Sequence, residues 1–207
     1  MEEIDIFIDA EYLIQSLRCL NGRRRALKKE DFVWHNFVKF IANGRKIGRI
    51  FYYTARLDES ENKATFDAQT LFLEQIKNQL SDYDFKLRLG KMIKIRNKTQ
   101  RTWREQQNVG HQQFSWGQKG IDTKIILDMC AFAYENAGNP EKTAVLVSGD
   151  EDFSDVLSLC REKGVRAELI MFDRFGSMPS EELKASAVSH TTLSFYDLER
   201  RNLIRNF

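Results

Sequence analysis

Two acidic residues stand at the ends of apolar segments that have the composition of buried strands. Asp9 ends the segment IDIFID (4–9), and Asp150 follows the apolar run TAVLVS (143–148) and Gly149. A charge at the end of a buried strand is costly unless a partner offsets it. The two positions therefore predict a site in which something neutralises these carboxylates.

Two further acids begin segments with a helical apolar pattern. Asp122 follows Gly120 in QKGIDTKIILDM, and Asp152 lies in SGDEDF, two residues after Asp150. Each could simply cap its helix, because carboxylates are favoured at helix N-termini. Together, the four acids are typical of a hard-cation site for Mg²⁺ or Mn²⁺, since a divalent ion removes the repulsion between clustered carboxylates. Such an ion can activate water and stabilise charge on a phosphodiester.

The elements that must position these acids alternate along the chain. Strands are predicted at 4–9, 48–55, 85–95, 143–148, 165–172 and 192–196, with helical apolar patterns between them. This alternation predicts an α/β sandwich with a mostly parallel central sheet. With the strand order 3-2-1-4-5, the strands that end at Asp9 and Asp150 are neighbours where the order reverses, which is where such sheets carry their chemistry. We therefore expect Asp9, Asp122 and Asp150 to converge.

Three segments carry a resemblance to a known family. IFIDAEYL, KGIDTKIILDM and VSGDEDFSDVLSLCREKGVRAEL, in this order and spacing, resemble the NYN domain, a branch of the PIN-like nucleases, and most of all its LabA-like bacterial members. The resemblance covers about 4–196. It implies a PIN-like three-layer sandwich and a metal-dependent ribonuclease that hydrolyses RNA phosphodiester bonds with Mg²⁺ or Mn²⁺.

The resemblance also assigns roles to the four acids. By matching motifs, Asp9, Asp122, Asp150 and Asp152 are the catalytic residues, and the first three are metal ligands. In the mechanism that this implies, an ion lies on Asp9 and Asp150. Asp122 and Asp152 then bind a second ion or orient the attacking water.

The chain departs from the family pattern at two places. Tyr12 stands where the family often has Asn, and 183–196 contains no acid where the family usually carries one. Glu11 could partly substitute, and His190 could approach the site from the acid-free segment. These departures favour an alternative: a catalytically weak or inactive RNA-binding or regulatory module. A second alternative, a Toprim-like domain, requires Glu at the end of the first strand, where this chain has Asp9.

The segment 86–119 is strongly basic. It holds nine Lys or Arg residues and one acid, Glu105, with aromatic residues interleaved. Basic groups contact phosphates and aromatic rings stack on unpaired bases, so the segment predicts a nucleic-acid surface in a hairpin or loop; a solvated hairpin is the alternative. The candidate RNA-binding residues are Lys94, Arg96, Lys98, Arg101, Trp103, Arg104, Trp116 and Lys119. A second basic cluster, at 18–29, could form another wall of the groove.

The remaining features of the sequence set the context. The 207 residues carry a net charge of +2 and fit a single domain over 1–207. No apolar run approaches the ~20 residues that span a bilayer, and the acidic start is unlike a signal peptide. Three cysteines without metal-ligand spacing fit a reducing compartment. We therefore expect a cytoplasmic protein without a membrane partner that acts on single-stranded regions of RNA; a homodimer remains open.

Overall fold

A seven-stranded sheet forms the centre of the molecule. The computed structural model describes residues 1–20, 27–96, 114–176 and 180–205. The strands lie in the order β4-β3-β2-β1-β5-β6-β7, and neighbours are parallel except for β3 and β4. Their bounds are β1 Glu3–Asp9, β2 Lys46–Arg56, β3 Asp84–Arg96, β4 Phe114–Lys119, β5 Lys142–Val147, β6 Arg166–Phe172 and β7 Ser189–Leu193.

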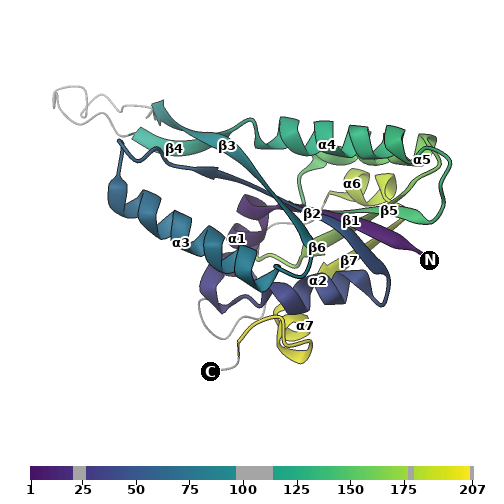
Figure 1. Ribbon diagram of the computed structural model, residues 1–207, viewed down its shortest axis with the longest axis horizontal. Coiled ribbons are helices and arrows are strands. Elements are labelled where there is room, and N and C mark those ends of the chain that lie inside the picture. The colour runs from purple at the N-terminus through teal and green to yellow at the C-terminus, as the bar shows by residue number, and fades with distance from the viewer. Residues whose placement is uncertain (21–26, 97–113, 177–179, 206–207) are drawn as a thin grey trace.

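Helices cover both faces of this sheet (Figure 1). On one face lie α4 (Ile121–Glu135), α5 (Ser154–Glu162) and α6 (Glu181–Ser186). On the other lie α1 (Ala10–Cys19), α2 (Trp34–Ala42), α3 (Lys63–Gln79) and α7 (Phe195–Arg200). Two short 3-10 turns, Lys29–Asp31 and Glu151–Phe153, precede α2 and α5. The predicted three-layer α/β arrangement with a mostly parallel sheet is confirmed.

Strand β1 explains why the sheet needs both layers. Ile4, Ile6 and Ile8 pack into the core beneath α1 and α2, while Phe7 packs into the core beneath α4. All four side chains are 0% exposed. A strand that is apolar on both faces can only be stable between two layers of helices. Because β1 is buried between the two layers, the position of Asp9, its last residue, at the edge of the sheet is fixed.

The expected strand order differs from the observed order in detail. The inner five strands, β3-β2-β1-β5-β6, follow the expected 3-2-1-4-5 pattern, but β4 and β7 extend the sheet at its two edges. Strand β4, FSWGQK, is a short edge strand that pairs with β3 among the described residues, and its apolar residues, Phe114 and Trp116, alternate over just its first half. It therefore could not be separated by sequence from the polar segment before it.

The last strand lies earlier in the chain than the predicted 192–196. Strand β7 ends at Leu193, and α7 begins at Phe195. Ser194 ends the strand because it caps this helix: its hydroxyl accepts a hydrogen bond from the Asp197 amide, and its own amide donates to the Asp197 carboxylate at 3.0 Å. This reciprocal pair is a capping box, which favours a helix start.

No helix in the part of the chain that the structure describes has the length and apolar character to cross a membrane.

The start of α4, which carries Asp122, is fixed by a close contact with β3. Gly120 precedes the helix with a left-handed φ of 81°, which glycine adopts without strain. Beneath it, a Cβ on Gly90 would lie 2.6 Å from Ile121 Cδ1 and 2.9 Å from the Lys119 carbonyl oxygen. Glycine at 90 therefore leaves room for Lys119 and Ile121 to pack directly against β3 where α4 begins.

We predict that Gly90→Ala destabilises the protein by about 1–3 kcal/mol, because the added methyl group overpacks this contact. The free energy of unfolding in urea measures the effect. Adding Ile121→Val to Gly90→Ala removes Cδ1 and should recover part of the loss. If Gly90→Ala alone is as stable as the wild type, the close packing does not position α4.

Candidate active site

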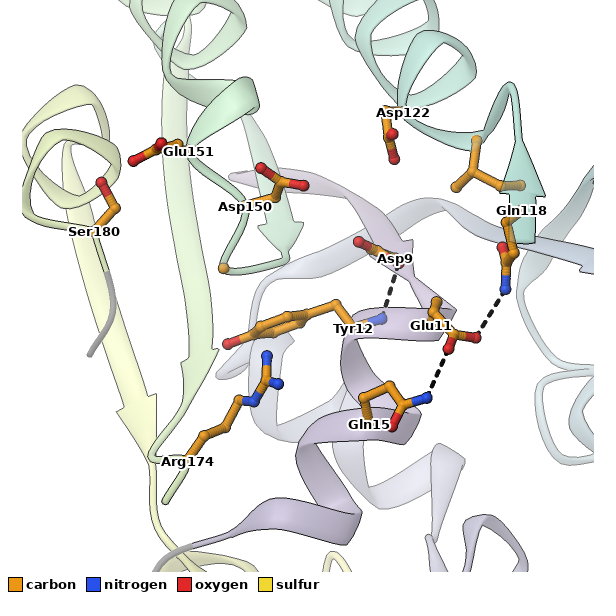
Figure 2. Close-up of a pocket in the computed structure, with 12 residues that line it drawn as sticks. Asp9, Glu11, Tyr12, Gln15, Gln118, Asp122, Asp150, Glu151, Arg174 and Ser180 are labelled. Atoms are coloured by element: carbon orange, nitrogen blue, oxygen red, sulfur yellow. Dashed lines mark hydrogen bonds between the residues drawn. The ribbon is translucent and has the colours of Figure 1, made fainter. Parts of the chain in front are cut away.

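A cavity of about 640 Å³ opens at the carboxyl edge of the sheet, where β1 and β5 end and α4 begins. Figure 2 shows acidic side chains from three separate elements around this space, with Tyr12 and Arg174 across from Asp122. The described residues that line it are Asp9, Glu11, Tyr12, Gln15, Gln118, Ile121, Asp122, Gly149, Asp150, Glu151, Arg174 and Ser180.

Asp9 is the most buried acid of the cavity, with 8% of its surface exposed. Its carboxylate accepts hydrogen bonds from the Tyr12 amide at 3.1 Å and from the Ser148 hydroxyl at 3.2 Å. Burial, followed by the charges of Asp122 and Glu11, outweighs these two bonds and raises the pKa of Asp9 from 3.8 to about 6. The fold therefore holds a carboxylate that is costly to ionise.

Asp122 and Asp150 are exposed at the rim of the same cavity. Partial burial and the charges of Asp150 and Asp152 raise the pKa of Asp122. Asp150 caps the 3-10 turn Glu151–Phe153 by accepting a hydrogen bond from the Asp152 amide at 3.1 Å. Asp9, Asp122 and Asp150 thus border one space, as Figure 2 shows. Nearby negative charges contribute to the raised pKa values of Asp9 and Asp122.

The donor chemistry of these residues fits a hard divalent cation. Carboxylate oxygens are the ligands that Mg²⁺ and Mn²⁺ prefer, and the cluster has an excess of negative charge that such an ion would offset. Within the described residues, however, no three acidic, His or Cys side chains already stand at the spacing of a closed metal site. The carboxylates of the cavity therefore fit an ion that keeps several bound waters and contacts the protein partly through them.

Tyr12 fills the position at which the resemblance leads one to expect Asn. Its hydroxyl accepts a hydrogen bond from the Phe172 amide at 3.0 Å, so the side chain ties α1 to the end of β6. Its ring takes the space in which Gly149 would carry a Cβ, which would lie 2.5 Å from Tyr12 Cε2. Tyr12 therefore closes one side of the cavity with an aromatic wall.

Glu11 is held in place by two amides. Gln15 donates to one of its carboxylate oxygens and Gln118 to the other, each at 2.8 Å (Figure 2). Gln118 belongs to β4, so this pair of bonds links the edge strand to the first turn of α1. Glu11 is exposed, adds negative charge beside Asp9 and lines the cavity, so its partial substitution for a missing acid stays a prediction.

Arg174 is a residue of the cavity that the sequence analysis missed. It follows the end of β6 and is half-buried, with its guanidinium 5.6 Å from the centre of the Tyr12 ring. Its Nε is buried without a hydrogen-bond partner among the described residues. Its position offered a signal, because a basic residue just past a buried parallel strand lies at the same edge as the acids.

Several predicted site residues lie elsewhere. Asp152 is exposed beside Asp150 but does not line the cavity, and neither does His190, which is exposed on β7. On the β3–β4 pair, Lys94 forms an ion pair with Glu61 and lies 5.3 Å from the centre of the Trp116 ring. Lys119 is exposed at the end of β4. The remaining candidates fall outside the described residues or have side chains that do: Arg96, Lys98, Arg101, Trp103 and Arg104.

The raised pKa of Asp9 predicts a pH dependence of stability for the metal-free protein. A carboxyl group with a pKa near 6 in the folded state and near 3.8 in the unfolded state binds its proton more tightly when folded. Stability should therefore rise as the pH falls from 7 to 4, by up to about 3 kcal/mol.

Asp9→Asn should abolish this part of the dependence, as measured by urea unfolding across that pH range in EDTA. The exposed Asp82→Asn serves as the control, and equal pH profiles for Asp9→Asn and wild type would contradict the assignment.

Comparisons with known proteins agree with this architecture. A solved structure of a protein of unknown function, VPA0982 from Vibrio parahaemolyticus RIMD 2210633, matches with a TM-score of 0.57 and 18% identity, over 94% of each chain. At that identity the likeness shows the fold alone. A search of curated proteins finds no match. The model of the NYN domain family matches residues 3–194, without assigning a branch within the family. This match covers nearly the whole chain and confirms the family expected from its three motifs: the protein belongs to the NYN domain family, a family of PIN-like nucleases.

Proposed function

We propose that the protein is a ribonuclease that hydrolyses RNA phosphodiester bonds with Mg²⁺ or Mn²⁺ at the cavity of Asp9, Asp122 and Asp150. One observation carries this proposal. Asp9 is buried at the end of β1, accepts two hydrogen bonds from the described residues, and has Asp122 and Glu11 as acidic neighbours. A fold that keeps such a group next to other acids has a need for a cation. Family membership supports nuclease chemistry at this place.

Asp9, Asp122 and Asp150 are the residues that would hold the ion. When bound, the ion would supply positive charge against the phosphodiester and make a bound water more acidic. Asp150 is exposed and fixed by its bond to the Asp152 amide, so it can orient an attacking water from the rim. Asp152, which lies outside the cavity lining, would at most orient that water through Asp150.

Arg174 gives the cavity a positive group opposite the acids. A half-buried guanidinium that lines the cavity can bind a phosphate oxygen of the substrate through a charge-assisted hydrogen bond. Lys119, at the end of β4, is the last residue of the basic segment 86–119 and continues its positive charge along the β3–β4 pair, which also carries Lys94 and Trp116. Single-stranded RNA would thus run from the β3–β4 pair to the acids, with its backbone held by these cations.

A rival function is RNA binding without cleavage. Tyr12 favours it, because an aromatic ring lies where the family often places an amide, and its hydroxyl accepts a hydrogen bond from the Phe172 amide at the end of β6. Metal-dependent cleavage of a generic single-stranded RNA separates the two functions. RNA binding without any cleavage in Mg²⁺ or Mn²⁺ would establish the rival.

Asp150→Asn tests the role of the exposed acid. The Asn side chain keeps an oxygen that can accept the Asp152 amide, so the turn should hold, while one negative charge leaves the cluster. We expect Mn²⁺-dependent cleavage of RNA to fall by about 10²–10³-fold. The melting temperature in EDTA should hold or rise, because repulsion with Asp122 is removed. Glu162→Gln, at the far end of α5, is the control. A loss of stability with intact cleavage would reduce Asp150 to a capping residue.

Arg174→Ala tests the phosphate contact. On the Asp150→Asn background, where the RNA stays intact, its affinity for single-stranded RNA should fall about 10–100-fold, the equivalent of one charge-assisted bond. The slope of log K against log salt should become shallower by about 0.7, because one fewer counterion is released. Arg166→Ala, at the opposite end of β6, should change neither quantity. An unchanged salt slope in Arg174→Ala would show that this residue does not contact the backbone.

A further inference from the structure

A second, smaller cavity of about 170 Å³ lies beside the first, between α1, α3 and the strands β2, β3 and β4. The two cavities share three lining residues, Glu11, Gln15 and Gln118. These are the residues of the hydrogen-bonded bridge in which both amides donate to the Glu11 carboxylate. The second cavity is therefore the space on the other side of a polar wall of the acidic site.

One residue that lines this cavity carries a buried hydroxyl whose hydrogen bonding is not satisfied by the described residues. Tyr52 is 0% exposed and lines the cavity, and its hydroxyl has no hydrogen-bond partner among the described residues. A buried hydroxyl without a partner is costly, and native structures satisfy nearly all such groups. A ligand that enters the cavity can provide the missing partner.

Gln118 presents a second unsatisfied atom at the same place. Its Nε2 donates to Glu11, whereas its buried Oε1 has no partner in the described part of the chain. This oxygen requires a donor, while the Tyr52 hydroxyl can donate or accept. The pair thus suits a ligand whose polar edge carries donors and acceptors side by side.

The size and the walls of the cavity restrict that ligand further. A cavity of about 150 Å³ takes one benzene ring, so 170 Å³ fits a single six-membered ring. Ile14, Phe72, Leu73 and Met92 provide apolar walls for the faces of such a ring. Lys29 and Arg56 also line the cavity, and they offer positive charge to a phosphate attached to it.

We propose that this second cavity binds a pyrimidine base of the RNA, in the nucleotide next to the phosphate that enters the acidic site. Tyr52 and Gln118 read the polar edge of the base, and the wall formed by Glu11 separates it from the acids. The inference rests on the proposed ribonuclease function and deepens it, because it gives the enzyme a preference for U or C beside the cleaved bond.

Binding of mononucleotides to the metal-free protein tests the cavity without any cleavage. In NMR titrations, uridine 5′-monophosphate should bind more tightly than adenosine 5′-monophosphate. Tyr52→Phe should weaken uridine monophosphate binding by about 3–10-fold, the equivalent of one neutral hydrogen bond. Its melting temperature should hold or rise, since the substitution removes only an unpaired hydroxyl.

Tyr53→Phe is the matched control, because Tyr53 lies on the same strand but faces the other layer, where its hydroxyl donates to Asp128 at 2.9 Å. It should leave nucleotide binding unchanged. The proposal is overturned if uridine monophosphate does not bind at millimolar concentration, or if it binds equally well to Tyr52→Phe and wild type.

Cleavage of poly(U) and poly(A) in Mn²⁺ separates the failure of this inference from that of the proposed function. Faster cleavage of poly(U), with a preference that shrinks in Tyr52→Phe, supports both. Equal cleavage of the two polymers in both proteins overturns the base-binding cavity and leaves the ribonuclease intact. If neither polymer is cleaved, the ribonuclease function fails and the mononucleotide titration alone decides the cavity.

Discussion

Asp9 is buried without a cationic partner among the residues that the structure describes, and the candidate site depends on this constraint. The same strand shows the contrast. Asp5, 3% exposed, accepts hydrogen bonds from the Arg49 amide at 2.9 Å and from its guanidinium at 2.6 Å. That pairing compensates the buried charge. Asp9, four residues later, has a backbone amide, a hydroxyl and two acidic neighbours instead. The fold therefore neutralises one buried charge within β1, that of Asp5, but leaves the charge of Asp9 at the end of the strand without such a pairing among the described residues.

The architecture explains how this charge is held in place. β1 is the central strand of the sheet, apolar on both faces, and its neighbours β2 and β5 bring their ends to the same edge. Asp9 cannot move toward solvent without disturbing the core, because it also begins α1 through its bond to the Tyr12 amide. Asp122 and Asp150 stand on helix starts around it, where carboxylates are stabilised. Rigid elements thus hold like charges together, an arrangement that trades stability for function.

The sequence predicted the parts of this site that follow from strand ends and helix starts. Asp9, Asp122 and Asp150 each lie at a boundary between an apolar pattern and a turn, so their common edge could be inferred. Arg174 and Gln118 could not be placed in the same way. Gln118 lies in the predicted hairpin of 86–119, but the β3–β4 register that brings it beside Glu11 is not set by a local pattern. Arg174 follows a strand end like the acids, but it is basic and stands outside the three motifs. The predicted strand at 192–196 overlaps the start of α7, although Ser194 and Asp197 have the spacing of a capping box, which indicates a helix start.

The central claim is that the three acids exist to bind a divalent cation. Anomalous scattering from a crystal grown or soaked with Mn²⁺ tests it most directly, because the peak locates the ion without reference to activity. We predict a peak in the cavity bordered by Asp9, Asp122 and Asp150, with at least one carboxylate oxygen at about 2.1–2.2 Å and waters completing the coordination. A crystal in millimolar Mn²⁺ that shows no peak in this cavity, or shows Mn²⁺ only at other surfaces, would contradict the account.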